Sequence, residues 1–187
     1  MNVYDFDGTI YDGDSSFHFL LFLATKKPGR MAKVLPAFLK AYFDYKEGKI
    51  SKETMKEQFF SILHWFPDPY GEVEEFWRSH LKRIKKFYYR CRKADDVIIS
   101  ASPEFLLRPV AQRFGFTLLA SPIDIYTGRY QGVNCHGTEK IKRLKEVFGE
   151  NVVVDEFYSD AMVDGPMAEF AQKAYLVKGE KITDWPL

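Results

Sequence analysis

Cysteine is scarce in this sequence, which has only Cys91 and Cys135 among its 187 residues. A single pair cannot build a disulfide framework, and two thiolates do not make a four-ligand zinc site. Sparse cysteine is typical of proteins in a reducing compartment, so we expect a cytoplasmic protein.

Long hydrophobic runs are also missing. The longest apolar stretch, Phe17 to Ala24, is interrupted by His18 and is far shorter than the roughly 20 residues of a membrane-spanning helix. The first residues, MNVYDFD, lack the positive start and the apolar centre of a signal peptide. We therefore expect neither a transmembrane segment nor a signal peptide, while peripheral membrane contact stays open.

A large excess of one charge is absent too, since 27 Lys and Arg face 26 Asp and Glu. This balance argues against a general nucleic-acid binder, whose domain would be basic overall. The balanced total charge nevertheless conceals two parts of the chain with opposite net charge. Residues 15–93 hold 17 basic and 8 acidic residues (net +9), whereas residues 1–14 and 94–187 hold 10 basic and 18 acidic residues (net −8). We predict a core domain, 1–14 and 94–187, and an inserted basic domain, 15–93.

The two acidic segments alternate between strand and helix patterns. Short apolar or β-branched runs predict strands at 2–6, 96–100, 151–154 and 174–177, and a hairpin at 123–131. Apolar residues three or four apart predict helices between them at 104–114 and 139–148. Strands that alternate with helices form a parallel sheet covered on both faces, so we expect a three-layer, Rossmann-like α/β core.

The inserted segment has a helical pattern instead. Spaced apolar positions predict helices at 31–45, 52–66 and 73–89, separated by breaks at glycine and proline. We therefore expect an α-helical domain inserted into the α/β core.

Acidic residues gather where two predicted strands end. Asp5 and Asp7 follow the first strand, and Asp160 and Asp164 follow the strand at 151–154. Like charges held together raise one another's pKa or recruit a cation, and open α/β sheets bind ligands at this edge. Carboxylate oxygens without His or Cys favour Mg²⁺, for which these four residues are the candidate ligands.

Two further residues suit a phosphoryl group. Ser100 ends the predicted middle strand, and Lys140 opens the helix at 139–148, where Lys142 and Lys145 compete for the same role. A hydroxyl, the adjacent backbone amide of Ala101 and an ammonium can together hold phosphoryl oxygens. The sequence thus offers a nucleophile, an acid, a metal site and a phosphate-binding site.

In this order the residues resemble the haloacid dehalogenase-like (HAD) phosphohydrolases. The four motifs of that family match, in chain order, Asp5 with Asp7 and Thr9, then Ser100, then Lys140, and finally Asp160 with Asp164. The helical insertion between the first two motifs resembles the cap of the phosphoserine-phosphatase-like branch. Four motifs, each at the end of a strand or helix, are far more specific than a lone Asp-x-Asp.

The resemblance implies a Mg²⁺-dependent phosphatase that hydrolyses a small phosphomonoester through an aspartyl-phosphate. Asp5 would be the nucleophile and Asp7 the general acid and base, while Ser100 and Lys140 would bind the phosphoryl group. Mg²⁺ would be held by Asp5, the Asp7 carbonyl and Asp160. A halide leaving group needs no proton, so Asp7 favours phosphoester hydrolysis over dehalogenation.

The substrate has several interpretations. By spacing, Asp14 occupies the position at which phosphoserine phosphatases bind the substrate amine, but it also suits the N-cap of a helix beginning near Ser15. The stretch 56–63 lacks the arginine of that group, which argues against phosphoserine. Similarity of 128–140 to phosphatidylglycerophosphatase-type enzymes leaves a peripheral lipid-phosphate phosphatase as an alternative. A catalytically silent phospho-ligand binding protein is another, and no pattern indicates an oligomeric state.

Overall fold

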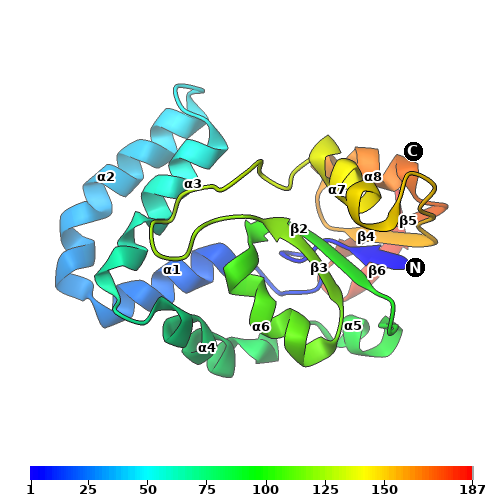
Figure 1. Ribbon diagram of the computed structural model, residues 1–187, viewed down its shortest axis with the longest axis horizontal. Helices are drawn as coiled ribbons and strands as arrows, with labels where there is room; N and C mark the ends of the chain where they lie inside the picture. Colours follow the sequence, from blue (N-terminus) through cyan, green and yellow to red (C-terminus); the bar gives the residue numbers. More distant parts are fainter. Residues whose placement is uncertain (187) are drawn as a thin grey trace.

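One six-stranded sheet organises the chain, which the computed structural model describes over residues 1–186 (Figure 1). The strand order is β3-β2-β1-β4-β5-β6, with β1 to β5 parallel and β6 antiparallel to β5. The strands are β1 (Asn2–Tyr4), β2 (Val97–Pro103), β3 (Thr117–Ser121), β4 (Glu156–Ser159), β5 (Lys173–Lys178) and β6 (Lys181–Asp184). The predicted α/β sheet is confirmed, with one antiparallel edge strand added.

Alternate residues of each strand point to opposite faces of the sheet, and each face has its own hydrophobic cluster. Val3 and Phe157 belong to the cluster that includes residues of α7 (Thr138–Phe148) and α8 (Gly165–Phe170). On the other face the rings of Tyr4 and Tyr158 stack with centroids 4.6 Å apart, and Tyr175 stacks on Tyr158 at 4.9 Å. Helices cover both faces, which confirms the three-layer arrangement (Figure 1).

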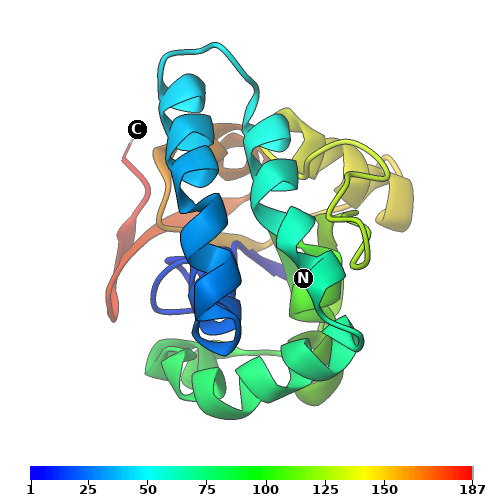
Figure 2. The same ribbon diagram turned by 90° about the vertical axis from the view of Figure 1, so that its left-hand side faces the viewer.

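The segment between β1 and β2 is helical, as predicted. It contains α1 (Ser15–Lys26), α2 (Pro28–Lys46), α3 (Lys52–Phe60), α4 (Pro69–His80) and α5 (Lys86–Cys91). The helices α2 and α3 lie side by side in both views, and the rings of Phe38 and Phe59 pack between them with centroids 4.9 Å apart (Figures 1 and 2). No helix among residues 1–186 is long and apolar enough to cross a membrane.

One hydrophobic cluster joins this helical segment to the sheet. It contains Phe19 of α1, Phe60 of α3 and Phe76 of α4 together with Tyr4 of β1. In addition, the indole nitrogen of Trp77 donates a hydrogen bond of 2.6 Å to the carbonyl of Leu106, in α6 (Glu104–Phe114). The division into 1–14 with 94–187 and 15–93 stays a prediction, and its last residue, 187, lies outside the described residues.

Two of the predicted helices end early. The helix expected at 52–66 stops at Phe60 and continues as a 3-10 helix, Ser61–Trp65. The helix expected at 73–89 is interrupted after His80 by the 3-10 turn Leu81–Arg83 and an extended pair of residues, Ile84 and Lys85. The backbone of this pair bonds to the loop after β1, because the Lys85 amide donates to the carbonyl of Ile10 at 2.8 Å.

The prediction of a strand at 151–154 was wrong. Residue 151 belongs to a turn, and residues 152–154 have no regular secondary structure. The strand follows them, at Glu156–Ser159. Its register pairs Tyr158 with Tyr4 of β1, a long-range contact that the local valine run does not reveal. The hairpin predicted at 123–131 is a loop with one isolated bridge, Ile123 to Tyr130, while β3 and β6 were not predicted at all.

Candidate active site

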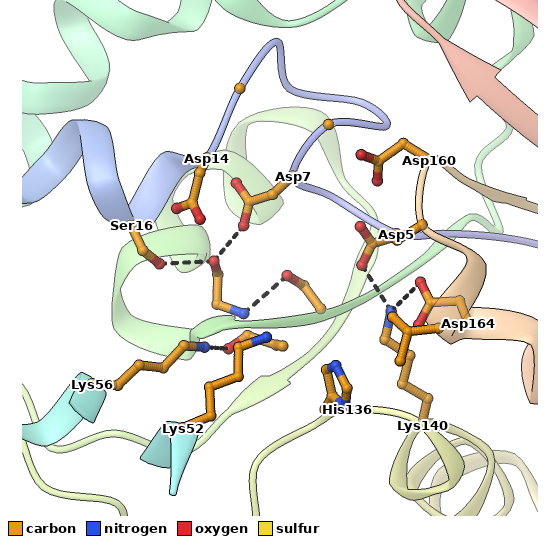
Figure 3. Close-up of a pocket in the computed structure, with 17 residues that line it drawn as sticks. Asp5, Asp7, Asp14, Ser16, Lys52, Lys56, His136, Lys140, Asp160 and Asp164 are labelled. Atoms are coloured by element: carbon orange, nitrogen blue, oxygen red, sulfur yellow. Dashed lines mark hydrogen bonds and ion pairs between the residues drawn. The ribbon is translucent and has the colours of Figure 1, made fainter. Parts of the chain in front are cut away.

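Three neighbouring strands bring the predicted site residues together at one edge of the sheet. Because β1 lies between β2 and β4, Asp5 after β1, Ser100 in β2 and Asp160 after β4 lie around one cavity of 410 Å³ (Figure 3). Ser100 does not end its strand as predicted, since β2 continues to Pro103. All residues proposed from the sequence line this cavity: Asp5, Asp7, Asp14, Ser100, Ala101, Lys140, Asp160 and Asp164. This is the edge where open α/β sheets bind ligands.

A glycine lets the loop after β1 turn against the loop after β4. Gly8 has a φ of +72°, and a Cβ built on it would lie 2.1 Å from Oδ2 of Asp160. Thr9 then joins the two loops, because its Oγ1 accepts a hydrogen bond of 2.9 Å from the Asp160 amide. The first and fourth motifs therefore touch directly through Gly8, Thr9 and Asp160.

Gly8→Ala is expected to lower kcat/KM for phosphoester hydrolysis by about 10²-fold, because the new methyl group must displace Asp160 and the backbone must hold an unfavourable positive φ. A steady-state phosphate-release assay measures this loss. Gly48→Ala, at a positive φ with nothing within 4 Å of the added Cβ, is the matched control for backbone strain alone. Equal activity of Gly8→Ala and the parent chain would contradict the steric argument.

Lys140 lies at the centre of the acidic residues. Its side chain is 2% exposed, and its ammonium lies 2.8 Å from Oδ1 of Asp5 and 2.8 Å from Oδ2 of Asp164. The Ser159 hydroxyl also donates a hydrogen bond of 2.7 Å to Oδ2 of Asp164. This bond fixes the position of the carboxylate that accepts from Lys140. The two carboxylates raise the pKa of Lys140, outweighing burial, and keep the lysine charged at neutral pH.

Asp7 is held by a separate set of donors. Its Oδ1 accepts a hydrogen bond of 2.6 Å from the Ser15 amide, and its Oδ2 accepts one from the Ser102 hydroxyl. The hydroxyl of Ser16 lies 2.9 Å from that of Ser102. These contacts fix the carboxylate between the start of α1 and the end of β2.

Burial changes the acidity of the carboxyl groups of Asp5 and Asp7. It raises the pKa of Asp7 to about 6, an effect that Asp14 strengthens and the bonds from Ser102 and Ser15 oppose. Burial raises the pKa of Asp5 as well, with Asp164 adding to the effect and Lys140 opposing it. Two carboxyls with raised pKa values in one cavity are typical of acid–base chemistry.

The acidic side of the cavity offers only oxygen donors to a metal. Asp5, Asp7 and Asp160 lie along one rim, with Asp164 beside Lys140 (Figure 3). Among residues 1–186, no three or more Asp, Glu, His or Cys side chains form a group that could hold a metal ion. An all-oxygen set that leaves room for water fits Mg²⁺, which keeps several waters when bound to proteins.

Asp14 serves in part as the helix cap that the sequence suggested. Its Oδ1 accepts a hydrogen bond of 2.8 Å from the Phe17 amide at the start of α1. The side chain also lines the cavity.

Sequence reasoning missed the residues that reach the cavity from other elements. Ser102 holds Asp7, and Lys52, Lys56 and His136 line the cavity from the side of α3 and the loop before α7. The helical spacing of Lys52 and Lys56 was the available signal, since residues four apart share one face of a helix. Nothing in the sequence pattern showed which face turns inward.

The mainly parallel sheet, with four carboxylates around a buried lysine at the carboxyl edge of its strands, is the arrangement expected of a phosphohydrolase that works through carboxylates. The chain belongs to the haloacid dehalogenase-like hydrolase family, whose model matches residues 3–169.

Two relatives align with nearly the whole chain. It is 30% identical over 188 residues to Protein CicA of Caulobacter vibrioides, an alignment that covers 93% of this chain and 84% of that protein. It is 23% identical over 215 residues to Histidinol-phosphatase of Neisseria meningitidis serogroup C, with 99% and 96% covered.

Solved structures share the fold. A Bordetella pertussis Tohama I protein of unknown function has a TM-score of 0.77 at 21% identity, with 93% of this chain and 87% of that chain covered. A probable phosphoserine phosphatase from Vibrio cholerae has a TM-score of 0.66 at 11% identity, with 92% and 55% covered. At these identities the two structures show that the chain shares their fold.

Proposed function

We propose that this phosphatase hydrolyses a small phosphomonoester through an aspartyl-phosphate on Asp5, with Mg²⁺ as cofactor. The observation that carries the proposal is the shared cavity of Asp5 and Asp7, in which Lys140 holds Oδ1 of Asp5 at 2.8 Å. A lysine that holds one oxygen of Asp5 leaves the other oxygen to attack a substrate, and Asp7, two residues along the chain, is a second carboxyl with a raised pKa.

In the first step the free oxygen of Asp5 attacks phosphorus. A bond forms between that oxygen and phosphorus, and the bond between phosphorus and the alcohol oxygen breaks. The protonated carboxyl of Asp7 gives its proton to the departing oxygen, so an alcohol leaves rather than an alkoxide. Ser100 and Lys140 hold the remaining phosphoryl oxygens.

In the second step water hydrolyses the aspartyl-phosphate. The Asp7 carboxylate takes a proton from the water as its oxygen bonds to phosphorus, and the bond between phosphorus and Asp5 breaks. The products are the alcohol and inorganic phosphate, and both carboxyl groups return to their starting states. Asp7 acts as acid and then as base, which suits a pKa of about 6.

Asp5, Asp160 and the backbone carbonyl of Asp7 are the residues that we assign to Mg²⁺, and Asp164 is assigned to orienting Lys140 or metal-bound water. When bound, the cation lowers the repulsion between an anionic nucleophile and a phosphate dianion. Phosphate release from p-nitrophenyl phosphate tests this assignment. Activity should be lost in EDTA and restored by excess Mg²⁺, whereas full activity in EDTA would rule out the metal.

Asp7→Asn is expected to discriminate between leaving groups. For ethyl phosphate, whose alkoxide needs a proton, kcat/KM should fall by about 10²–10⁴-fold. For p-nitrophenyl phosphate, whose phenolate leaves without one, the fall should be much smaller. The ratio kcat/KM reports only the steps up to loss of the alcohol, so the second role of Asp7 does not enter the comparison.

Asp12→Asn is the matched control for this experiment. Asp12 lies in the same loop, has a side chain 71% exposed and does not line the cavity. It should behave like the parent chain on both substrates. Equal losses on the two substrates in Asp7→Asn would show that Asp7 does not protonate the leaving group.

A further inference from the structure

Two lysines of α3 enter the cavity from the side opposite the metal-binding carboxylates. Lys52 and Lys56 are four residues apart and share one face of the helix. Figure 3 shows both side chains reaching into the cavity across from Asp160 and Asp164, with His136 between them and Lys140. The mechanism above uses neither lysine.

The adjacent face of α3 holds these lysines in place. Oε1 of Glu53 accepts a hydrogen bond of 2.9 Å from Nδ2 of Asn134, and Oε1 of Glu57 accepts one of 2.9 Å from the Tyr130 amide. Both partners belong to the loop between β3 and α7. Because these two bonds fix the rotation of the helix, Lys52 and Lys56 line the cavity, where both are half-buried.

The two ammonium groups have no carboxylate partner among residues 1–186. Lys56 donates to a neutral acceptor, the carbonyl of Ala101, at 2.7 Å, and the Lys52 ammonium has no ion pair or hydrogen bond with any residue in the described range 1–186. The charges of Asp14, Asp7 and Glu53 act on Lys56 without forming an ion pair with it. Each of these carboxylates has another partner: Asp14 caps α1, Asp7 accepts from Ser15 and Ser102, and Glu53 accepts from Asn134. Burial and the neighbouring Lys52 lower the pKa of Lys56 to about 8.

On this side of the cavity, two half-buried ammonium groups without an ion-pair partner favour an anion, because charge-assisted hydrogen bonds to it would pair them. Lys56 already contacts Ala101, the residue next to Ser100. An anionic group at these lysines could therefore belong to the same small molecule as a phosphoryl group held by Ser100 and Lys140.

We propose that Lys52 and Lys56 form a subsite for a second anionic group, so that the preferred substrate is a small phosphomonoester that also carries a carboxylate or a second phosphate. This inference rests on the proposed function, because the subsite is defined relative to the phosphoryl group that Asp5 attacks.

Substrates of similar size and different charge test the subsite. Ethyl phosphate has no second charge, phosphoglycolate adds a carboxylate, ethylene glycol bisphosphate adds a phosphate, and phosphoethanolamine adds an ammonium. In the parent chain, kcat/KM for at least one of the two doubly anionic substrates should exceed that for ethyl phosphate by about 10- to 100-fold, as charged hydrogen bonds allow. The larger of the two values identifies the second group.

Substitutions of Lys52 then test the assignment to this residue. Lys52→Met should lower the preference for the second anion over ethyl phosphate by about tenfold, and Lys52→Glu should reverse it in favour of phosphoethanolamine. Lys33→Met removes the same charge from an exposed position of α2 outside the cavity, and it should keep the preference of the parent chain. Urea unfolding checks that each variant is folded.

The outcomes separate the two proposals. No preference in the parent chain, or a parallel loss on every substrate in Lys52→Met, would overturn the subsite while leaving the phosphatase mechanism intact. Absence of turnover on every substrate in the parent chain would overturn the proposed function itself, and the subsite with it.

Discussion

Asp5→Asn should lower kcat for every phosphomonoester by about 10⁴–10⁶-fold, the loss expected when a nucleophile is removed. The amide that replaces the carboxylate has the same shape but lacks an anionic oxygen to attack phosphorus. Lys140 keeps its contact with Asp164 in this variant, at 2.8 Å in the parent chain, so its charge is still paired. We therefore expect the variant to fold and to bind substrate without turnover.

Rapid quenching with intact-mass measurement follows the intermediate directly. The parent chain, stopped during turnover of p-nitrophenyl phosphate, should carry one added phosphoryl group, and Asp5→Asn should carry none. Asp12→Asn is the matched control, because it makes the same change in an exposed residue of the same loop. Phosphatase activity of Asp5→Asn within tenfold of the parent chain would contradict the assignment of Asp5 as the nucleophile.

The central part of this site could be predicted because Asp5 and Asp160 follow strands that are neighbours in the sheet. The carboxyl ends of parallel strands meet at one edge, so these two residues lie together, and Ser100 lies beside them within the neighbouring strand β2. Asp160 lines the cavity although its strand was misplaced, because the observed strand, Glu156–Ser159, ends immediately before it. The position after a strand mattered more than the bounds of the strand.

Contacts between distant elements could not be predicted in this way. The loop after β1 interrupts the helix expected at 73–89, because its backbone pairs with that of Ile84 and Lys85. Likewise, the inward face of α3 is set by Glu53 and Glu57, whose partners lie more than 70 residues away in the chain. Helical spacing gives the faces of α3 but not their direction, so the role of Lys52 and Lys56 needed the structure.

Lys140→Met should lower the free energy of unfolding by about 3–5 kcal/mol at pH 8, because it leaves Asp5 and Asp164 buried beside each other without a cation. Methionine keeps most of the length and the apolar character of the side chain, so packing changes little. The loss therefore measures the charge. In the same variant, kcat/KM should fall by about 10²–10³-fold, since a preorganised cation at the phosphoryl oxygens is gone.

The pH dependence of this loss follows from the acidity of Asp5. Burial and Asp164 raise its pKa in the folded chain, and Lys140 opposes them. Without the lysine the pKa of Asp5 rises further. A carboxyl with a raised folded-state pKa stabilises the fold when it is protonated, and this contribution is lost as the pH rises through that pKa. The deficit of Lys140→Met should therefore shrink when the pH is lowered from 8 to 5.

Urea unfolding in the presence of EDTA, at pH 5 and pH 8, measures both effects. Lys142→Met is the matched control on the same helix, because its side chain is 63% exposed and its ion pairs are long, at 3.8 and 3.9 Å. It should change stability by no more than about 0.5 kcal/mol. If Lys140 served only to bind substrate phosphate, Lys140→Met would raise KM and leave unfolding unchanged at both pH values. A joint loss of stability and turnover, with the loss of stability larger at pH 8, is expected only if the lysine also balances the charges of Asp5 and Asp164.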